Sequence, residues 1–138
     1  MNLGGVLGIV KMGDRISFQF KNGDELSVAF FSHWDGKSIL SMVKQYFKEF
    51  VRRRMVDNLG DERAFPFNAL PLGRGEPNTM MLDFIVWFFK EMGRETVDSN
   101  YYLGKDDCDG DNSDNGNFIF DVPVELQEAG YLEDKKRV

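Results

Sequence analysis

One acidic segment of this 138-residue chain carries the side chains that a metal ion needs. Residues 106–117 read DDCDGDNSDNGN and end where an apolar strand pattern begins. Calcium prefers about six to eight hard oxygen ligands, which carboxylate and amide groups supply. The segment therefore predicts a site for a divalent cation, with Ca2+ as the ion. The predicted ligands are Asp107, Asp109, Asp111, Asp114 and Asn115.

The spacing of these residues matches an EF-hand loop only in part. A loop that starts at Asp107 fails at its twelfth position, where Phe118 replaces the bidentate Glu. A loop that starts at Asp111 has Val122 at that position. Two interpretations therefore stay open. The segment is either a nonstandard calcium loop or a hairpin loop whose Asp and Asn residues favour turns and whose charge opposes strand aggregation.

The only histidine lies in a second candidate segment, Ser32-His33-Trp34-Asp35-Gly36, between a predicted strand and a predicted helix. His33 could act as a general base or help to bind an anion at the helix start, with Asp35 beside it. We favour a structural interpretation, in which Asp35 caps the helix, Trp34 packs in the core and His33 lies on the surface. A hydrolase-type enzyme using His33 is thus the least favoured function.

Cysteine usage and net charge exclude several other functions. Cys108 is the only cysteine, so an internal disulfide and a multi-cysteine zinc site are ruled out. A thiol among several aspartates has its thiolate disfavoured, which argues against a catalytic pair with His33. A net charge of -6 argues against binding to nucleic acid, because that affinity comes from Lys and Arg displacing counterions.

No membrane segment is expected either. The longest apolar run, residues 80–89, is far shorter than the roughly 18 to 20 residues that a bilayer span needs. The N-terminal residues lack the basic segment and the cleavage pattern of a signal peptide. A cytoplasmic location is therefore expected.

Alternating apolar residues predict a β-hairpin over residues 14–31. A three-residue loop, residues 21–23, would pair Ile16 with Val28 and Phe18 with Leu26, and apolar side chains would then face one another.

Two helices are predicted after the hairpin. An apolar stripe with helical spacing covers residues 36–58, and a second helix runs from Asn78 or Thr79 to about Met92, ended by Gly93. Nine of the ten residues from 80 to 89 are apolar, so the second helix is expected to be covered on most sides. The Pro- and Gly-rich residues between the helices, 60–78, predict a long connecting loop.

The last elements are two strands, at residues 99–103 and 117–122, which the acidic loop would join into a second hairpin. Residues 124–130 predict one or two helical turns. The fold class is therefore α+β: a single domain with one mainly antiparallel sheet and its helices on one face. Residues 133–138 are expected to be a flexible tail.

The chain has Gly13-Asp14-Arg15 before a hairpin and the junction Ser32-His33-Trp34-Asp35-Gly36 before a helix. In these features it resembles a set of small uncharacterised prokaryotic and viral proteins. Those proteins are also similar in placing an Asp/Asn/Gly-rich turn before a late strand.

This resemblance covers about residues 12–40 and 98–122. It implies that Met12 corresponds to the start of the related proteins, with residues 1–11 as an extension. It implies no activity.

The alternative to calcium binding is protein-protein interaction, or a homo-oligomeric structural role without metal. It rests on the nearly all-apolar segment at residues 80–89, part of which could form a subunit interface. An unidentified protein partner or self-association would follow from this alternative.

Overall fold

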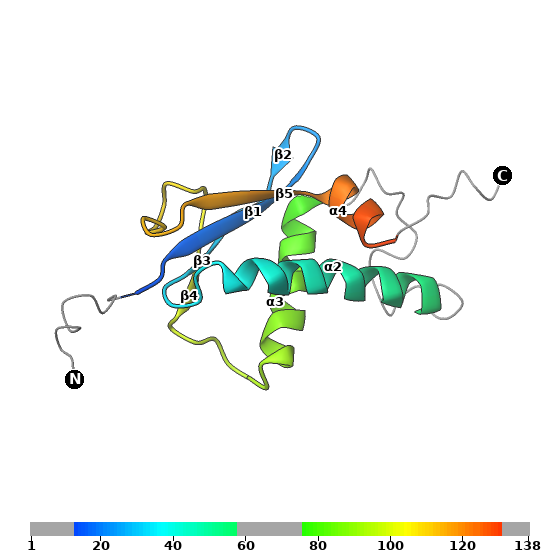
Figure 1. Cartoon of the computed structure of the whole chain (residues 1–138), viewed down its shortest axis with the longest axis horizontal. Coiled ribbons are helices and arrows are strands. Elements are labelled where there is room, and N and C mark those ends of the chain that lie inside the picture. Colours follow the sequence, from blue (N-terminus) through cyan, green and yellow to red (C-terminus); the bar gives the residue numbers. More distant parts are fainter. Residues whose placement is uncertain (1–12, 58–75, 131–138) are drawn as a thin grey trace.

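The computed structural model describes residues 13–57 and 76–130, with the side chains of 54–57 left out of the description. The predicted N-terminal extension at 1–11, the flexible tail at 133–138 and most of the connecting loop at 60–78 lie outside these residues. The described elements, in chain order, are β1 (Ile16–Asn22), β2 (Glu25–Leu26), β3 (Ala29–Ser32), α2 (Ser38–Asp57), α3 (Pro77–Glu91), β4 (Tyr101–Gly104), β5 (Asn117–Asp121) and α4 (Val122–Glu128). They confirm the predicted α+β fold (Figure 1).

The sheet is built around β1, which has strand neighbours on both sides. β2 and β3 pair antiparallel with β1, and β4 continues the sheet beyond β3. β5 pairs with β1 in parallel, with Ser17 opposite Asn117 and Lys21 opposite Asp121. The sheet is thus mainly antiparallel, as predicted, with one parallel pair at its β5 edge.

The predicted second hairpin is wrong. β4 and β5 do not pair with each other, because β3 and β1 lie between them. The acidic loop therefore does not turn between neighbouring strands but carries the chain from one edge of the sheet to the other. Strand periodicity predicts that a strand exists and which face is buried, but it does not specify the neighbour.

The predicted register of the first hairpin is also wrong. Asn22 lies opposite Glu25, which leaves a two-residue turn, and Phe18 lies opposite Phe30 instead of Leu26. Gly23 in the turn has a φ of 63°, which glycine adopts without strain. The pairing register shifts by one residue at positions 27 and 28, so a β-bulge interrupts the alternation on which the prediction depended.

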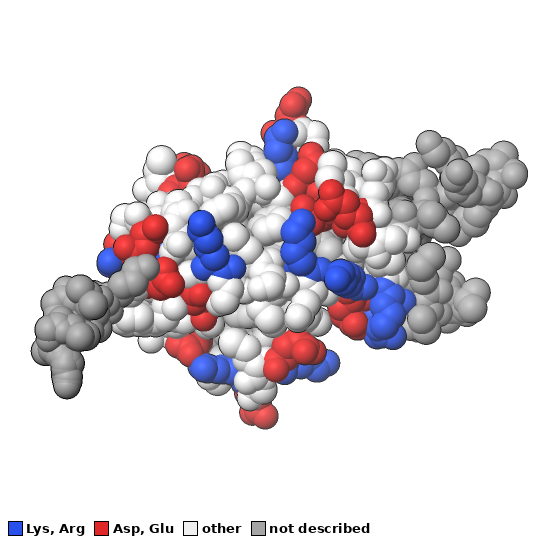
Figure 2. All heavy atoms as spheres, viewed as in Figure 1, with Lys and Arg blue, Asp and Glu red and all other residues white. Residues whose placement is uncertain are grey.

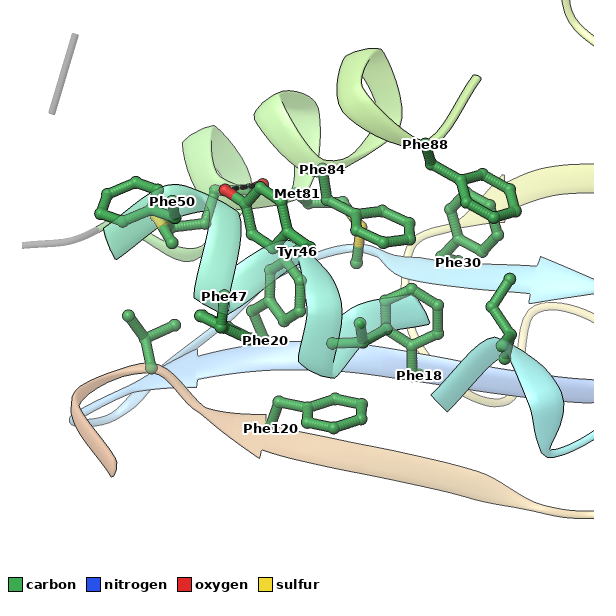
Figure 3. Packing of buried hydrophobic residues seen from close by; sticks show 14 of the residues in the cluster. Phe18, Phe20, Phe30, Tyr46, Phe47, Phe50, Met81, Phe84, Phe88 and Phe120 are labelled. Carbon is green, nitrogen blue, oxygen red and sulfur yellow. Dashed lines mark hydrogen bonds between the residues drawn. The ribbon is translucent and has the colours of Figure 1, made fainter. Parts of the chain in front are cut away.

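The core lies between one face of the sheet and the helices α2 and α3 (Figure 3). Phe18 contributes most centrally, with ring centroids 5.1 Å from Phe30 and 5.3 Å from Phe84 of α3. The predicted stripe of α2 is buried there, and its members are Ile39, Val43, Tyr46, Phe47 and Phe50. Helical spacing therefore predicted this face correctly.

α3 ends close to the predicted position, with Gly93 at a φ of 70° just beyond it. Its predicted coverage on most sides is only partly right, because Leu82 and Val86 are exposed.

At the end of β5, Asp121 caps α4 by accepting a hydrogen bond of 3.1 Å from the main-chain N–H of Val124. No helix in the described part of the chain is both long enough and apolar enough to span a membrane.

Candidate functional site

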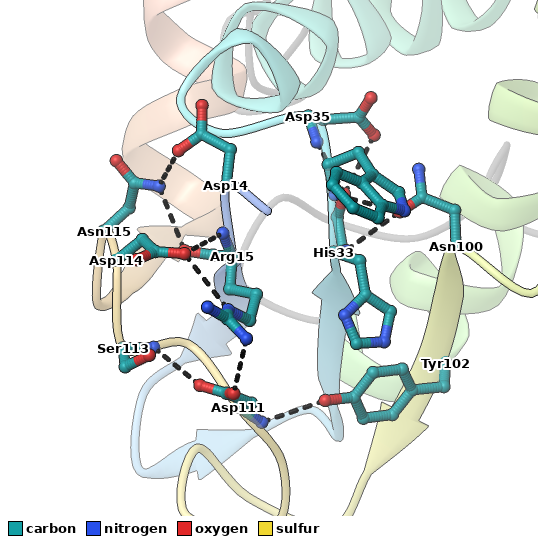
Figure 4. A network of polar contacts seen from close by, with 12 residues as sticks. Asp14, Arg15, His33, Asp35, Asn100, Tyr102, Asp111, Ser113, Asp114 and Asn115 are labelled. Carbon is teal, nitrogen blue, oxygen red and sulfur yellow. Dashed lines mark hydrogen bonds and ion pairs between the residues drawn. The ribbon is translucent and has the colours of Figure 1, made fainter. Parts of the chain in front are cut away.

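Both candidate segments meet at one end of the sheet, although they lie far apart in the sequence (Figure 4). Asp14 and Arg15 lie just before β1, His33 directly follows β3, and β4 leads into the acidic loop. A single polar network links these elements.

Arg15 is the cation of this network. Its Nε atom lies 3.1 Å from Oδ2 of Asp114, and its Nη1 atom lies 3.2 Å from Oδ2 of Asp111. Its main-chain N–H also donates to Asp114, at 2.9 Å. The hydrogen bond to Asp114 and the charge of Asp111 raise the pKa of Arg15. Two of the predicted calcium ligands thus already face a positive charge from the chain itself.

The other predicted metal ligands turn toward different partners. Asp109 accepts a hydrogen bond of 2.9 Å from the main-chain N–H of Lys105. The Nδ2 group of Asn115 donates to Asp14 at 2.6 Å and to the main-chain oxygen of Arg15 at 3.0 Å. Asp109 and Asn115 therefore help to hold the loop in place.

Asp107 lies in the one group of three described residues whose donor atoms approach within 4.8 Å of one another. The other two members are Asp106 and Cys108, and all three are partly or fully exposed. No three of the predicted aspartates lie that close in the described residues. The predicted calcium site stays a prediction.

The acidic loop covers the face of the sheet opposite the core. The rings of Phe31 and Tyr102 stack there with centroids 4.9 Å apart and planes at 3°. Gly110 lies directly on this stack, because a Cβ atom at Gly110 would come within 2.7 Å of the Phe31 ring. The hydroxyl oxygen of Tyr102 accepts a hydrogen bond of 2.9 Å from the main-chain N–H of Asp111. Glycine is thus required where the loop crosses the aromatic pair.

A chain of polar side chains continues along this second face. Asn112 donates to Ser17 at 2.8 Å, and Ser17 donates to Asn117 at 2.6 Å. Asn117 then donates to Gln19 at 3.0 Å, and Gln19 donates to the main-chain oxygen of Ser27 at 3.0 Å. These bonds satisfy the buried side chains of Ser17 and Gln19, which the sequence analysis did not single out. In the sequence, Ser17 and Gln19 alternate with Phe18 and Phe20, and this alternation could have indicated a second, polar face of β1.

The candidate catalytic residues have separate surroundings. The His33 ring lies 5.6 Å from the Tyr102 ring, whereas the Asp35 carboxylate accepts a hydrogen bond of 3.0 Å from Oγ of Ser32 (Figure 4). The main-chain N–H of Ser38 bonds the main-chain oxygen of Asp35. The two side chains are therefore not arranged as a base and its orienting carboxylate.

Trp34 is 59% exposed, so the prediction that it packs in the core is wrong. The reason lies in the backbone, because Oδ1 of Asn100 accepts hydrogen bonds from the N–H groups of both His33 and Trp34. These bonds hold the junction in a turn that directs the indole outward. Asn100 lies 66 residues further along the chain, and no local pattern predicts it.

The basic residues of α2 are largely paired within the chain. Figure 2 shows Lys and Arg side chains along α2 with acidic side chains beside them. Lys44 lies 2.7 Å from Glu125 of α4, and Arg53 lies 3.0 Å from Asp83 of α3. These pairs join α2 to its neighbouring helices.

An apolar groove of about 380 Å³ lies between α3 and the outer side of β4. We call it the β4 groove, and its lining residues are Phe30, Ile85, Phe89, Val97, Tyr101, Tyr102 and Leu103. Val97 is 75% exposed and Leu103 is 52% exposed. Residues 80–89 were expected to supply apolar surface, but the second wall of the groove, which β4 supplies, was not predicted from the sequence.

Comparisons with protein-family models, with curated proteins and with solved structures found no match to this chain.

Proposed function

We propose that the protein is a protein-interaction module and that the β4 groove is its contact surface. The observation that supports this proposal is one hollow whose lining has only apolar and aromatic residues, two of which, Val97 and Leu103, are exposed. Exposed apolar patches on a folded protein mark interaction surfaces, because each Å² removed from water gains about 25 cal/mol.

The position of the groove supports the same function. One side of β4 pairs with β3, and within residues 13–57 and 76–130 no strand pairs with its other side. The N–H groups of Tyr101 and Lys105 already donate to Asp98 and Asp109, so the outward main-chain groups left for a partner are those around Leu103. A sheet edge with unpaired peptide groups recruits other chains unless it is blocked. The exposed Leu82 and Val86 add further apolar surface on α3.

Calcium binding through residues 106–117 is a second, weaker proposal. It is supported by the density of carboxylates, but most of the described ones already accept hydrogen bonds or face Arg15. Hydrolysis at His33 has less support, since Asp35 does not orient its ring.

A selection experiment tests the interaction module. A phage-displayed peptide library would be selected on the full chain, and the binding site of the selected peptides would be mapped by amide chemical shifts. We expect the shifts to gather at residues 85–103 around the groove. Selected peptides that all bind elsewhere would overturn the proposal.

Two matched variants make this test specific. Leu103→Asp places a charge in the groove, whereas Ile119→Asp places one on β5 at the other edge of the sheet, and both side chains are 52% exposed. Binding should fall at least tenfold in the first variant and stay unchanged in the second. Val97→Asp, outside any strand, repeats the test without perturbing the sheet.

A further inference from the structure

We infer that the occupant of the β4 groove is an extended apolar segment of a partner protein, flanked by basic residues, which adds to β4 as a further strand. This inference rests on the proposed function and names the partner's chemistry. The groove, the free edge of β4 and the charges at both ends of β4 each support one part of it.

The free edge of β4 favours an extended partner over a helical one. An added strand can pair its main-chain N–H and C=O groups with the outer peptide groups of an edge strand. The main-chain groups of a helix are already bonded within the helix, so it cannot pair in this way. β4 is short, at four residues, and the N–H groups of Tyr101 and Lys105 already donate to Asp98 and Asp109. The main-chain bonds of a partner would therefore centre on Leu103, and alone they would give little affinity. The adjoining groove supplies the rest through apolar burial.

The side-chain alternation of β4 matches an alternating partner. Tyr101 and Leu103 both line the groove and lie opposite Ser32 and Phe30 on the core face of the sheet. A strand added beside β4 would direct every second side chain to the same face, over Ile85 and Phe89. A partner segment with two or more apolar residues at alternate positions fits this surface.

The two ends of β4 favour basic residues in the partner. Each end carries one cation and two anions, namely Arg94, Glu95 and Asp98 before the strand and Lys105, Asp106 and Asp107 after it. The side-chain charges at each end, one positive and two negative, therefore sum to -1. Of these ions only Arg94 and Asp98 pair with each other among the described residues.

The same charges disfavour a second copy of this chain as the occupant. Antiparallel pairing of β4 with β4 of another copy would place the start of one strand beside the end of the other. A negatively charged end of one copy would then lie beside a negatively charged end of the other at both ends of the strand pair. Like charges opposite each other on paired strands destabilise the pair. The net charge of -6 on each chain adds long-range repulsion.

Three synthetic peptides test the inference on the full chain. The capped peptide KKTVTVTKK has the inferred pattern, EETVTVTEE reverses its flanking charge, and an N-methylated form of the first lacks alternate main-chain donors. We expect the lysine peptide to shift the amide signals of residues 101–105 and to bind at least tenfold more tightly than the glutamate peptide at low salt. That ratio should shrink as salt screens the charges, and N-methylation on the β4-facing side should abolish binding.

Other results overturn the inference while leaving the proposed function standing. One is a set of library-selected peptides that occupy the groove as helices or without basic flanks. Another is a concentration-dependent dimer in sedimentation that Leu103→Asp dissociates. Equal binding of the lysine and glutamate peptides, or failure of both to shift β4, contradicts the inference directly. Failure of the interaction module itself is recognised separately, by selected peptides that never bind at the groove.

Discussion

The Nε atom of Arg15 lies 3.1 Å from Oδ2 of Asp114, and this contact joins two residues that are 99 positions apart in the chain. The main-chain N–H of Arg15 reaches the same oxygen, and its guanidinium also reaches Asp111. The residue just before β1 therefore supplies the positive charge around which the acidic loop is arranged.

Replacing Arg15 should loosen the loop. In Arg15→Gln the carboxylates of Asp111 and Asp114 would repel each other without a neutralising charge. We expect hydrogen exchange at residues 113–116 to become several-fold faster, while α2 and α3 exchange as before. Arg52→Gln is the control, because Arg52 pairs with Glu49 within one helix. Unchanged exchange in the loop would show that Arg15 does not hold it.

Acid should release the loop in a defined pH range. Hydrogen bonds from Ser113, together with the charge of Arg15, lower the pKa of Asp111 below its ordinary 3.8. A carboxyl whose pKa is lower in the folded state stabilises that state above its unfolded pKa and loses the contribution as pH falls through its folded pKa. The loop should thus be unaffected above about pH 5, as judged from the Asp111 and Ser113 amide signals. Ser113→Ala should move the Asp111 titration upward, and an unmoved midpoint would contradict the assignment.

Gly110→Ala should destabilise the protein by about 1–3 kcal/mol, as overpacking does. The new methyl group would meet the stacked rings of Phe31 and Tyr102 at under 3 Å. Urea unfolding measures the cost. In the background Phe31→Leu, which opens space below the loop, the cost should shrink, and equal costs in both backgrounds would show that the stack is not the obstacle.

Asp83→Ala should weaken the contact between α2 and α3. Asp83 accepts hydrogen bonds of 2.8 Å from the buried hydroxyl of Tyr46 and 3.0 Å from Arg53. Burial and the charge of Asp83 raise the pKa of Tyr46, so its hydroxyl stays protonated and needs an acceptor. Loss of that acceptor should cost about 1–3 kcal/mol. Glu49→Ala, at an exposed pair, should cost less than about 1 kcal/mol, and equal losses would refute the special role of Asp83.

The calcium hypothesis predicts that millimolar Ca2+ raises the melting temperature, since a ligand that prefers the folded state stabilises it by mass action. It also predicts shifts in the amide signals of residues 106–117, with Mg2+ as the control ion. Asp107→Asn should weaken the response. An unchanged melting temperature together with unchanged loop amides would remove calcium from consideration.

Local patterns in the sequence predicted the helices well. The stripe of α2 and the end of α3 at Gly93 depend on spacing and capping within a few residues, and both agree with the structure. The bulge at residues 27–28 was not predicted, because strict alternation assumes an unbroken strand. The exposure of Trp34 likewise depends on Asn100, a distant partner.

The sequence shows which residues make up the acidic segment, but not which contacts their side chains make. The sequence identified the acidic segment, but its principal cation, Arg15, comes from the opposite end of the chain. The β4 groove was missed for the same reason, since α3 and β4 form its walls only after the chain has folded. Composition reveals which residues are available, whereas the sheet order determines which of them meet.

The parallel pairing of β1 with β5 also bears on how the protein is made. β1 leaves the ribosome before its partner, which spans residues 117–121 and follows about a hundred residues later. Contacts so distant in sequence form slowly, because a long loop must close first. One edge of β1, beside Phe18 and Phe20, therefore stays unpaired until residues 117–121 have been synthesised. The nascent chain has a long interval in which a chaperone could shield that edge from aggregation.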